Sequence, residues 1–178
     1  GFHISSFIAG KIFKIYGIFS KRTSIAIYNI GDVIKGINVK EKKKIIFKMW
    51  ENFGRVIGEY PSLDKIRVIG NKSIKIINLR NLLDPLKKNK NCLFFSAHLG
   101  NWELTSHALT ENGFDINFIY RAPNNQYVDH LLRRIRYNYG VGLIKKGPKG
   151  AKECIKILSK NGGNIGMLID QKMNDGIS

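Results

Sequence analysis

The sequence has few cysteines, and their spacing matches no metal-binding pattern. Cys92 and Cys154 are the two cysteines among 178 residues, with no Cys-x-x-Cys or His-x3-His pair nearby. We therefore expect neither a zinc site nor a disulfide framework, and a reducing compartment is the simpler expectation. No Pro/Ser-rich linker and no internal repeat interrupts the chain, so its length predicts one domain.

Acidic residues are scarce. Thirteen Asp and Glu face 30 Lys and Arg, which leaves a net charge of +17. Such a charge favours polyanionic partners: nucleic acid, phosphorylated lipid, an anionic membrane surface or an acidic protein. The alternative is compositional, because 22 of the 30 basic residues are lysine in a chain also rich in Ile and Asn, as an A/T-rich genome encodes.

No uncharged apolar run is long enough to cross a bilayer, which takes about 18 such residues. Residues 2–19 are mostly apolar, but His3, Lys11 and Lys14 interrupt them. Apolar positions at helical spacing with interleaved lysines predict a helix within residues 1–20 that lies in a membrane interface; a first core helix is the alternative. These positions are Ile4, Ile8, Ile12, Ile15 and Phe19.

Common nucleotide-binding and hydrolase motifs are also absent. Gly140-Val141-Gly142 lacks the third glycine of a dinucleotide fingerprint, and Pro148 follows Gly147 where a P-loop needs lysine. No Gly-x-Ser-x-Gly elbow occurs. The sequence therefore disfavours a phosphate cradle for nucleotides and an acyl-enzyme formed on serine.

Hydrophobic periodicity predicts an N-terminal helical region followed by an α/β fold. A helix over residues 45–60 ends at Pro61, a hairpin is expected over 66–78, and a short helix with a polar connection over 79–90. Beyond these, strands are expected at 92–97, 116–120, 141–144 and 164–169, and helices at 102–112, 125–139 and 150–160. This alternation predicts right-handed crossovers and a mainly parallel sheet whose chemistry gathers at the carboxyl ends of the strands.

A histidine and a glutamate follow the first of these strands, in the segment His98-Leu99-Gly100-Asn101-Trp102-Glu103. A tight turn at Gly100 would bring Glu103 back to His98, so that the carboxylate holds one imidazole nitrogen and leaves the other as a general base. Backbone N–H groups at the start of the next helix would bind negative charge. The alternative is a histidine that caps a helix or packs in the core.

Polar residues also follow two other strands. Arg121 follows the second strand and could hold a phosphate or an oxyanion with two nitrogens, the alternative being a surface salt bridge. Because consecutive parallel strands usually neighbour each other, we expect Arg121 in the cleft of His98. Asp170-Gln171 follows the fourth strand, with a helix or turn cap as the alternative.

Taken together, these blocks resemble the lipid A biosynthesis (late) acyltransferases of Gram-negative bacteria, of the lauroyl or myristoyl type, in the lysophospholipid and glycerol-phosphate acyltransferase superfamily. The segment from His98 to Glu103 resembles the family's His-x4-Asp/Glu block. Tyr120-Arg121 with Asn124-Asn125 resembles the second block, and Asp170-Gln171 the third. The segment Trp50-Glu51-Asn52-Phe53-Gly54-Arg55 with Glu59 looks like the family's N-terminal region.

The resemblance implies a glycerol-phosphate acyltransferase-like fold and transfer of an acyl chain from acyl carrier protein to a phosphorylated glycolipid precursor of lipid A. It implies no metal and no cofactor, an anionic membrane as a partner, and a place on the cytoplasmic face of the bacterial inner membrane. Family members usually begin with a hydrophobic anchor and continue past the third block, so we expect residues 1–178 to be one acyltransferase domain cut short at both ends. The expected catalytic residues are His98 and Glu103, and the expected substrate- or oxyanion-binding residues are Arg121, Gly100, Asn101, Asp170 and Gln171.

Two alternatives remain open. A lysophospholipid could replace the glycolipid as acceptor, because His98 and Glu103 would serve any hydroxyl group. A basic nucleic-acid-binding domain is the second alternative, supported by the lysines at 40–48 and by Arg133, Arg134 and Arg136. The sequence lacks the aromatic-basic alternation of an RNA-binding sheet, and these arginines are expected on the outside of a crossover helix, so no nucleic acid is expected.

Overall fold

The structure, a computed structural model, describes residues 1–170 of the 178-residue chain. Its contacts form two compact units, Gly1–Ser62 and the chain from Leu63 onward. The first unit is helical and the second holds a parallel sheet, which confirms the expected α/β class with an N-terminal helical region. That residues 1–178 act as one domain stays a prediction.

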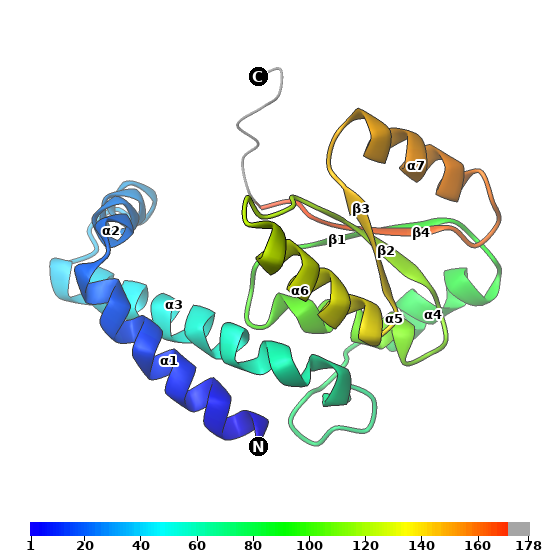
Figure 1. The fold of residues 1–178 in the computed structure, drawn as a ribbon. Coiled ribbons are helices and arrows are strands. Elements are labelled where there is room, and N and C mark those ends of the chain that lie inside the picture. The colour runs from blue at the N-terminus through cyan, green and yellow to red at the C-terminus, as the bar shows by residue number, and fades with distance from the viewer. Residues whose placement is uncertain (171–178) are drawn as a thin grey trace. The chain divides into compact units, whose positions relative to one another are not determined.

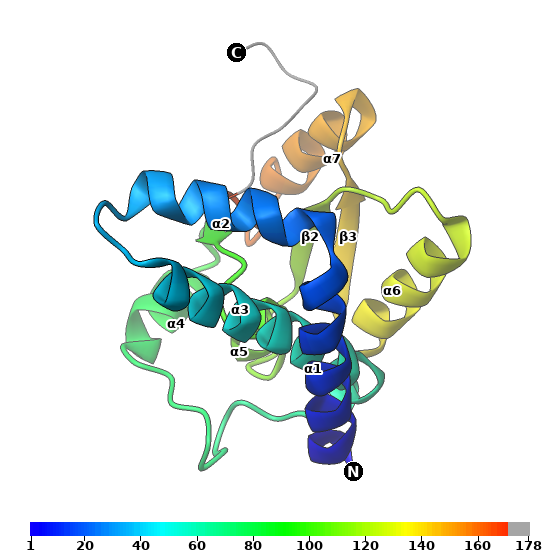
Figure 2. The same ribbon diagram turned by 90° about the vertical axis from the view of Figure 1, so that its left-hand side faces the viewer.

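The helical unit consists of α1 (Phe2–Phe19), α2 (Lys21–Val33) and α3 (Val39–Glu59). Helices α1 and α3 lie side by side and run in opposite directions (Figures 1 and 2). Small residues allow this close approach, because a Cβ atom on Gly58 would lie 2.5 Å from the backbone oxygen of Ser5. The periodicity predicted α1 and α3 but not α2.

One carboxylate links these two helices. Glu51 on α3 accepts hydrogen bonds from Lys11 and Lys14 on α1, each at 3.0 Å, and from Arg55 one turn later on α3, at 3.2 Å. These hydrogen bonds, that of Lys14 first, lower the pKa of Glu51 from 4.5 to about 2. The carboxylate therefore stays ionised at neutral pH and offsets part of the positive charge of this unit.

The sheet of the second unit has the strand order β1-β4-β2-β3, with parallel pairing throughout. Its strands are β1 (Cys92–Ser96), β2 (Ile116–Tyr120), β3 (Val141–Lys145) and β4 (Asn164–Leu168). η1 (Tyr60–Lys65) spans the division between the two units in sequence, and the helices that follow it are α4 (Leu79–Lys87), η2 (Trp102–Thr105), α5 (His107–Thr110), α6 (Gln126–Asn138) and α7 (Pro148–Leu158). Figure 1 shows α5 and α6 on one face of the sheet and α7 on the other.

The strand order corrects one expectation. Strand β4 lies between β1 and β2, so the strand that leads to Arg121 does not neighbour the strand that leads to His98. Neighbouring of consecutive strands is a preference and not a rule. β4 fits beside β2 because Gly166 has no side chain. A Cβ atom on Gly166 would lie 2.6 Å from the ring of its pairing partner Phe118 on β2.

Two predicted elements are wrong. Residues 66–78 form turns and not a hairpin, because the carboxylate of Glu111 takes the N–H groups of Val68 and Ile69, and Asn71 accepts from Ser73 as a local turn. The helix expected over 102–112 is split into η2 and α5. Hydroxyl groups in this segment bond to nearby carbonyl oxygens, which disfavours a continuous helix.

Candidate active site

His98 lies where β1 ends, as expected from the sequence. The chain turns sharply just after it, with a hydrogen bond from the N–H of Leu99 to the oxygen of Ala97 at 2.8 Å. Gly100 then adopts a φ of +55°, a left-handed conformation that favours glycine. The His98 side chain is 28% exposed, so a substrate can reach it.

The register between β1 and β4 decides what meets His98. Cys92 pairs with Asn164 and Ser96 with Leu168, a constant offset in residue number. The ladder continues past both strands, since the N–H of Ile169 donates to the oxygen of Ser96 at 3.0 Å. Two residues beyond Ser96 and Leu168, the same register places His98 beside Asp170, and the structure brings them together.

Asp170 makes two hydrogen bonds with His98. Its Oδ2 accepts from the backbone N–H of His98 at 2.9 Å, and its Oδ1 lies 2.8 Å from Nδ1 of the imidazole. These hydrogen bonds lower the pKa of Asp170 below its ordinary value. The ring of Trp102 meets the imidazole edge-on, with 5.1 Å between ring centroids. Within residues 1–170, no hydrogen bond occupies Nε2 of His98.

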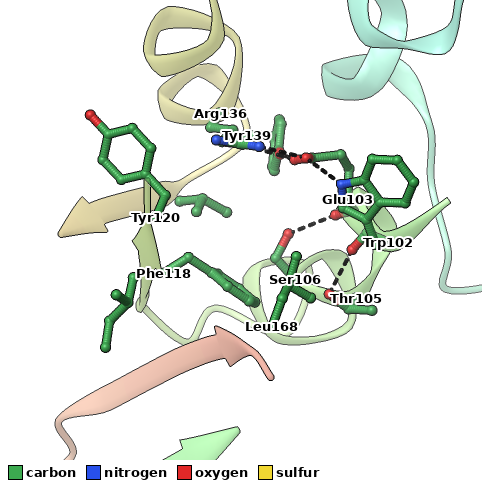
Figure 3. A pocket seen from close by; sticks show the side chains of 11 residues that line it. Trp102, Glu103, Thr105, Ser106, Phe118, Tyr120, Arg136, Tyr139 and Leu168 are labelled. Atoms are coloured by element: carbon green, nitrogen blue, oxygen red, sulfur yellow. Dashed lines mark hydrogen bonds and ion pairs between the residues drawn. The ribbon is translucent and has the colours of Figure 1, made fainter. Parts of the chain in front are cut away.

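The expected hydrogen bond from Glu103 to His98 is not formed; this corrects the sequence interpretation. Glu103 is 6% exposed, and its carboxylate accepts from Nε and Nη2 of Arg136 at 2.9 and 2.6 Å. Tyr139 donates to the same carboxylate at 2.9 Å and Trp102 at 3.1 Å (Figure 3). A buried carboxylate needs a cation and several donors; here α6 supplies the cation, Arg136, and Tyr139 and Trp102 supply the other donors.

Sequence reasoning missed Arg136 and Tyr139 as parts of this site. Arg136 was expected on the outer face of a crossover helix, but its side chain is mostly buried against Glu103. The missing signal was positional: a glutamate placed at a strand end inside the fold requires a buried cation. Tyr139 is buried directly after the end of α6 and stacks on His107 with 4.6 Å between centroids.

A small cavity of about 50 Å³, partly open to solvent, lies beside this cluster. The charged pair of Glu103 and Arg136 stands at one end, and side chains of η2 and of strands β2, β3 and β4 contribute to the rest of the lining (Figure 3). Trp102 lines the cavity and also contacts the ring of His98, so the cavity lies next to His98. The apolar lining comes from Phe118, Ile119, Val141 and Leu168.

Gly100 and Asn101 shape the turn after His98. The side-chain oxygen of Asn101 accepts the N–H of Glu103 at 3.1 Å, and its backbone oxygen accepts the N–H of Leu104 at 3.2 Å. The N–H groups of Glu103 and Leu104 therefore already have acceptors within the turn; the expectation that N–H groups at the start of this helix bind negative charge stays a prediction. The segment that follows is also only a short 3-10 helix.

Arg121 lies exposed just past β2, and within residues 1–170 its side chain makes no hydrogen bond or ion pair. It does not line the cavity beside Glu103, and β4 separates its strand from β1, so the structure does not confirm a shared cleft with His98. Burial, followed by a hydrogen bond with Asp129, raises the pKa of Tyr120. Gln171, the last expected binding residue, lies outside the described residues.

No group of His, Cys, Asp and Glu side chains in the described part of the chain could hold a metal ion. Both cysteines are free, and burial raises the pKa of the Cys154 thiol, which disfavours a reactive thiolate there. The expectation that the protein needs no metal or cofactor stays a prediction.

Helix α1 exposes an apolar surface on the helical unit. Among the described residues, no helix combines the length and the apolar character needed to cross a membrane. Lysines 40–48 at the start of α3 add positive charge to the same unit. The large apolar side chains exposed on α1 include Ile4, Ile8, Ile12, Ile15 and Phe19, all positions of the predicted interface helix.

Comparison with known proteins identifies the family. The model of the family described as bacterial lipid A biosynthesis acyltransferase matches residues 2–178, nearly the whole chain. No curated protein matches the chain. The family match, together with the parallel sheet and a histidine at the carboxyl edge of a strand, shows that the chain belongs to this family and is an acyltransferase of lipid A synthesis.

Proposed function

We propose that this member of the bacterial lipid A biosynthesis acyltransferase family transfers a fatty acyl chain, of the lauroyl or myristoyl class, from acyl carrier protein to a hydroxyl group of a phosphorylated lipid A precursor. One observation carries the proposal: His98 is partly exposed at the edge of the sheet, hydrogen-bonded through Nδ1 and open at Nε2. An imidazole held in this way can act as a general base near neutral pH.

In the proposed reaction, Nε2 of His98 takes the proton of the acceptor hydroxyl while its oxygen attacks the thioester carbonyl carbon. A C–O bond forms and the carbonyl oxygen becomes a tetrahedral oxyanion. The oxyanion collapses, the C–S bond breaks, and the imidazolium returns its proton to the leaving thiolate. Acyl ester and free thiol are the products, with no covalent enzyme intermediate.

The cavity lined by Phe118, Ile119, Val141 and Leu168 supports an acyl substrate, because it offers apolar surface beside Trp102 and hence beside His98. We propose that this small cavity receives part of the acyl chain next to the thioester. The salt-bridged pair of Glu103 and Arg136 holds the turn after His98 against α6, which keeps this wall in place.

Arg121 and the net charge of +17 support anionic substrates. Arg121 is exposed and uncommitted within the described residues, so its guanidinium can bind a phosphate of the acceptor. Acyl carrier protein as an acidic donor and the anionic cytoplasmic leaflet of the inner membrane fit the same sign of charge. The apolar face of α1 suits contact with that leaflet.

The test is acyl transfer by the full-length protein and by His98→Ala, with acyl carrier protein or coenzyme A thioesters as donors. The acceptors are a phosphorylated lipid A precursor and a lysophospholipid. We expect transfer to the lipid A precursor from the carrier-protein donor, and a loss of about 10²-fold or more in His98→Ala with unchanged circular dichroism.

Mass spectrometry of lipid A from cells that lack and then regain the gene gives the in vivo readout. One added acyl chain on restoring wild type, and none on restoring His98→Ala, supports the proposal. Preference for the lysophospholipid would replace the acceptor, and full activity of His98→Ala would refute His98 as the base.

A further inference from the structure

We infer that Asp170, and not Glu103, is the positioning residue of His98: it fixes the imidazole with its proton on Nδ1 and so leaves Nε2 unprotonated to accept a hydroxyl proton. The inference rests on the proposed role of His98 as general base. It gives Asp170 a different function from the substrate or oxyanion binding expected from the sequence.

Two donors converge on the Asp170 carboxylate, and one of them cannot reverse its role. The backbone N–H of His98 always donates, and it occupies Oδ2 at 2.9 Å. Oδ1 lies 2.8 Å from Nδ1. An ionised carboxylate has no proton to give, and its pKa is lowered here, so Nδ1 must be the donor. In the neutral ring the lone pair then resides on Nε2.

Glu103 cannot also position His98 in the observed arrangement. Its Oε1 already accepts from Arg136 and Trp102, and its Oε2 from Arg136 and Tyr139. Its side chain is 5% exposed, whereas that of Asp170 is 36% exposed. Moving Glu103 to His98 would leave the guanidinium of Arg136 without its carboxylate in a mostly buried place, which is costly.

The arrangement depends on strand pairing. Because β4 pairs with β1 in a register that continues to His98 and Asp170, the base is positioned by a strand that enters the sheet 72 residues later in the chain. The edge of Trp102 lies against the imidazole and limits its rotation away from Asp170. Ring position and ring tautomer are therefore set by separate contacts.

The Asp170→Asn variant tests this assignment directly. The amide has one acceptor atom, and the fixed backbone N–H of His98 will take it, so the NH₂ group faces Nδ1. Nδ1 must then accept a hydrogen bond, and the proton moves to Nε2. The base would be blocked while the fold and the surrounding side chains stay in place.

We would record ¹⁵N spectra of the histidine rings at mildly alkaline pH, identifying the His98 signals by their loss in His98→Ala. His107 is an internal reference of the opposite tautomer, because its Nε2 donates to the oxygen of Leu63 at 2.9 Å. We expect His98 to be Nδ1-protonated in the wild type and Nε2-protonated in Asp170→Asn, like His107. Asp170→Glu should restore the wild-type tautomer.

Acyl transfer is measured on the same samples. Asp170→Asn should lower kcat by about 10³-fold, with KM values changed less than about threefold, since the fault is in the base and not in substrate binding. Asp170→Glu should recover part of the rate. Asp32→Asn, which removes an exposed carboxylate paired with Lys35, is the matched control and should change neither readout.

The outcomes separate the two hypotheses. If His98→Ala is inactive while Asp170→Asn keeps its tautomer and full rate, Asp170 is not the positioning residue and the proposed function stands. If Glu103→Gln, and not Asp170→Asn, switches the tautomer, the assignment is overturned in favour of Glu103. If His98→Ala is fully active, the proposed mechanism fails and the role of Asp170 fails with it. Should Asp170→Asn not fold, a wild-type His98 protonated on Nε2 is sufficient to overturn the inference.

Discussion

Arg136 holds the carboxylate of Glu103 with two nitrogens, Nε at 2.9 Å from Oε2 and Nη2 at 2.6 Å from Oε1. Arg136 is on α6 and Glu103 is on η2, the short helix that follows the turn after β1, so the pair joins two separate elements. Both side chains are mostly buried. The glutamate of the His-x4-Glu block is thus part of a structural ion pair that supports the turn carrying His98.

The Arg136→Lys variant should therefore lose stability more than a surface arginine would. A lysine supplies one point charge in place of two fixed donors, and Tyr139 and Trp102 cannot replace them. We expect a loss of about 2 kcal/mol in urea unfolding, and about 3 kcal/mol or more for Glu103→Ala, which leaves Arg136 unpaired.

Acyl transfer should fall with stability in these variants, by about 10²-fold or more for Glu103→Ala. The tautomer of His98 should stay unchanged, because Glu103 does not contact it in this structure. Wild-type stability of Glu103→Ala would contradict the structural role. Arg134→Lys, at an exposed position of the same helix, is the control and should stay within about 0.5 kcal/mol of wild type.

The sequence predicted most elements because their patterns are local. The strand at residues 116–120 agrees with β2, and the helices expected over 125–139 and 150–160 agree with α6 and α7 to within a few residues. The hairpin at 66–78 was wrong because its backbone donors bind a side chain, Glu111, that lies far away in the sequence. Local patterns carry no information on such a competitor.

Strand order explains the errors at the site. The sequence correctly placed His98 and Asp170 at strand ends, but it could not show that β4 would lie between β1 and β2. That order brings Asp170 to His98 and separates Arg121 from it. The role of Glu103 was misread for a related reason, since its partner Arg136 comes from a crossover helix whose inward face is fixed only by tertiary packing.

Arg121→Lys should separate activity from stability. Within residues 1–170 the Arg121 side chain makes no hydrogen bond or ion pair, so the free energy of unfolding should change by no more than about 0.5 kcal/mol. If Arg121 binds an acceptor phosphate with two nitrogens, the lysine loses one of them, and KM for the acceptor should rise about tenfold. The same KM as wild type would show that Arg121 does not touch substrate.

Glu51 predicts a pH dependence in the helical unit. Its folded pKa of about 2 lies below the ordinary 4.5, so its stabilising contribution is complete above about pH 4.5 and is lost as the pH falls toward 2. Glu51→Gln should lose about 1 kcal/mol at pH 7 and should flatten this dependence. Asp32→Asn, which removes one exposed ion pair with Lys35, should keep the wild-type dependence of unfolding free energy on pH.

Urea unfolding followed by Trp50 fluorescence, in a Trp102→Phe background, measures this unit because Trp50 is on α3. The indole of Trp50 donates to Thr23 at 2.8 Å, so loss of helix packing changes its environment. If the free energy of unfolding changes with pH equally in wild type and Glu51→Gln between pH 4.5 and 2, the contacts of Glu51 with Lys11 and Lys14 do not stabilise the fold.

Membrane contact through α1 is the last prediction. The exposed side chains of Ile8 and Ile12 face away from α3 at helical spacing, and Lys11 and Lys14 flank them, which is the pattern of an interfacial helix. We expect the full chain to bind vesicles with anionic lipid more tightly than neutral ones, and increased salt to weaken that binding because the attraction is electrostatic.

Replacement of Ile8 and Ile12 together by serine should weaken binding to anionic vesicles by about tenfold or more, since each buried isoleucine contributes apolar free energy in the interface. The fold should not change, because both side chains are exposed in the structure. Ile155→Ser, at an exposed isoleucine of α7, is the matched control and should bind like wild type. Sedimentation with vesicles measures the binding of wild type, the double variant and Ile155→Ser. Two results would count against α1 as the contact: equal binding to neutral and anionic vesicles, or an effect of Ile155→Ser as large as that of the double variant.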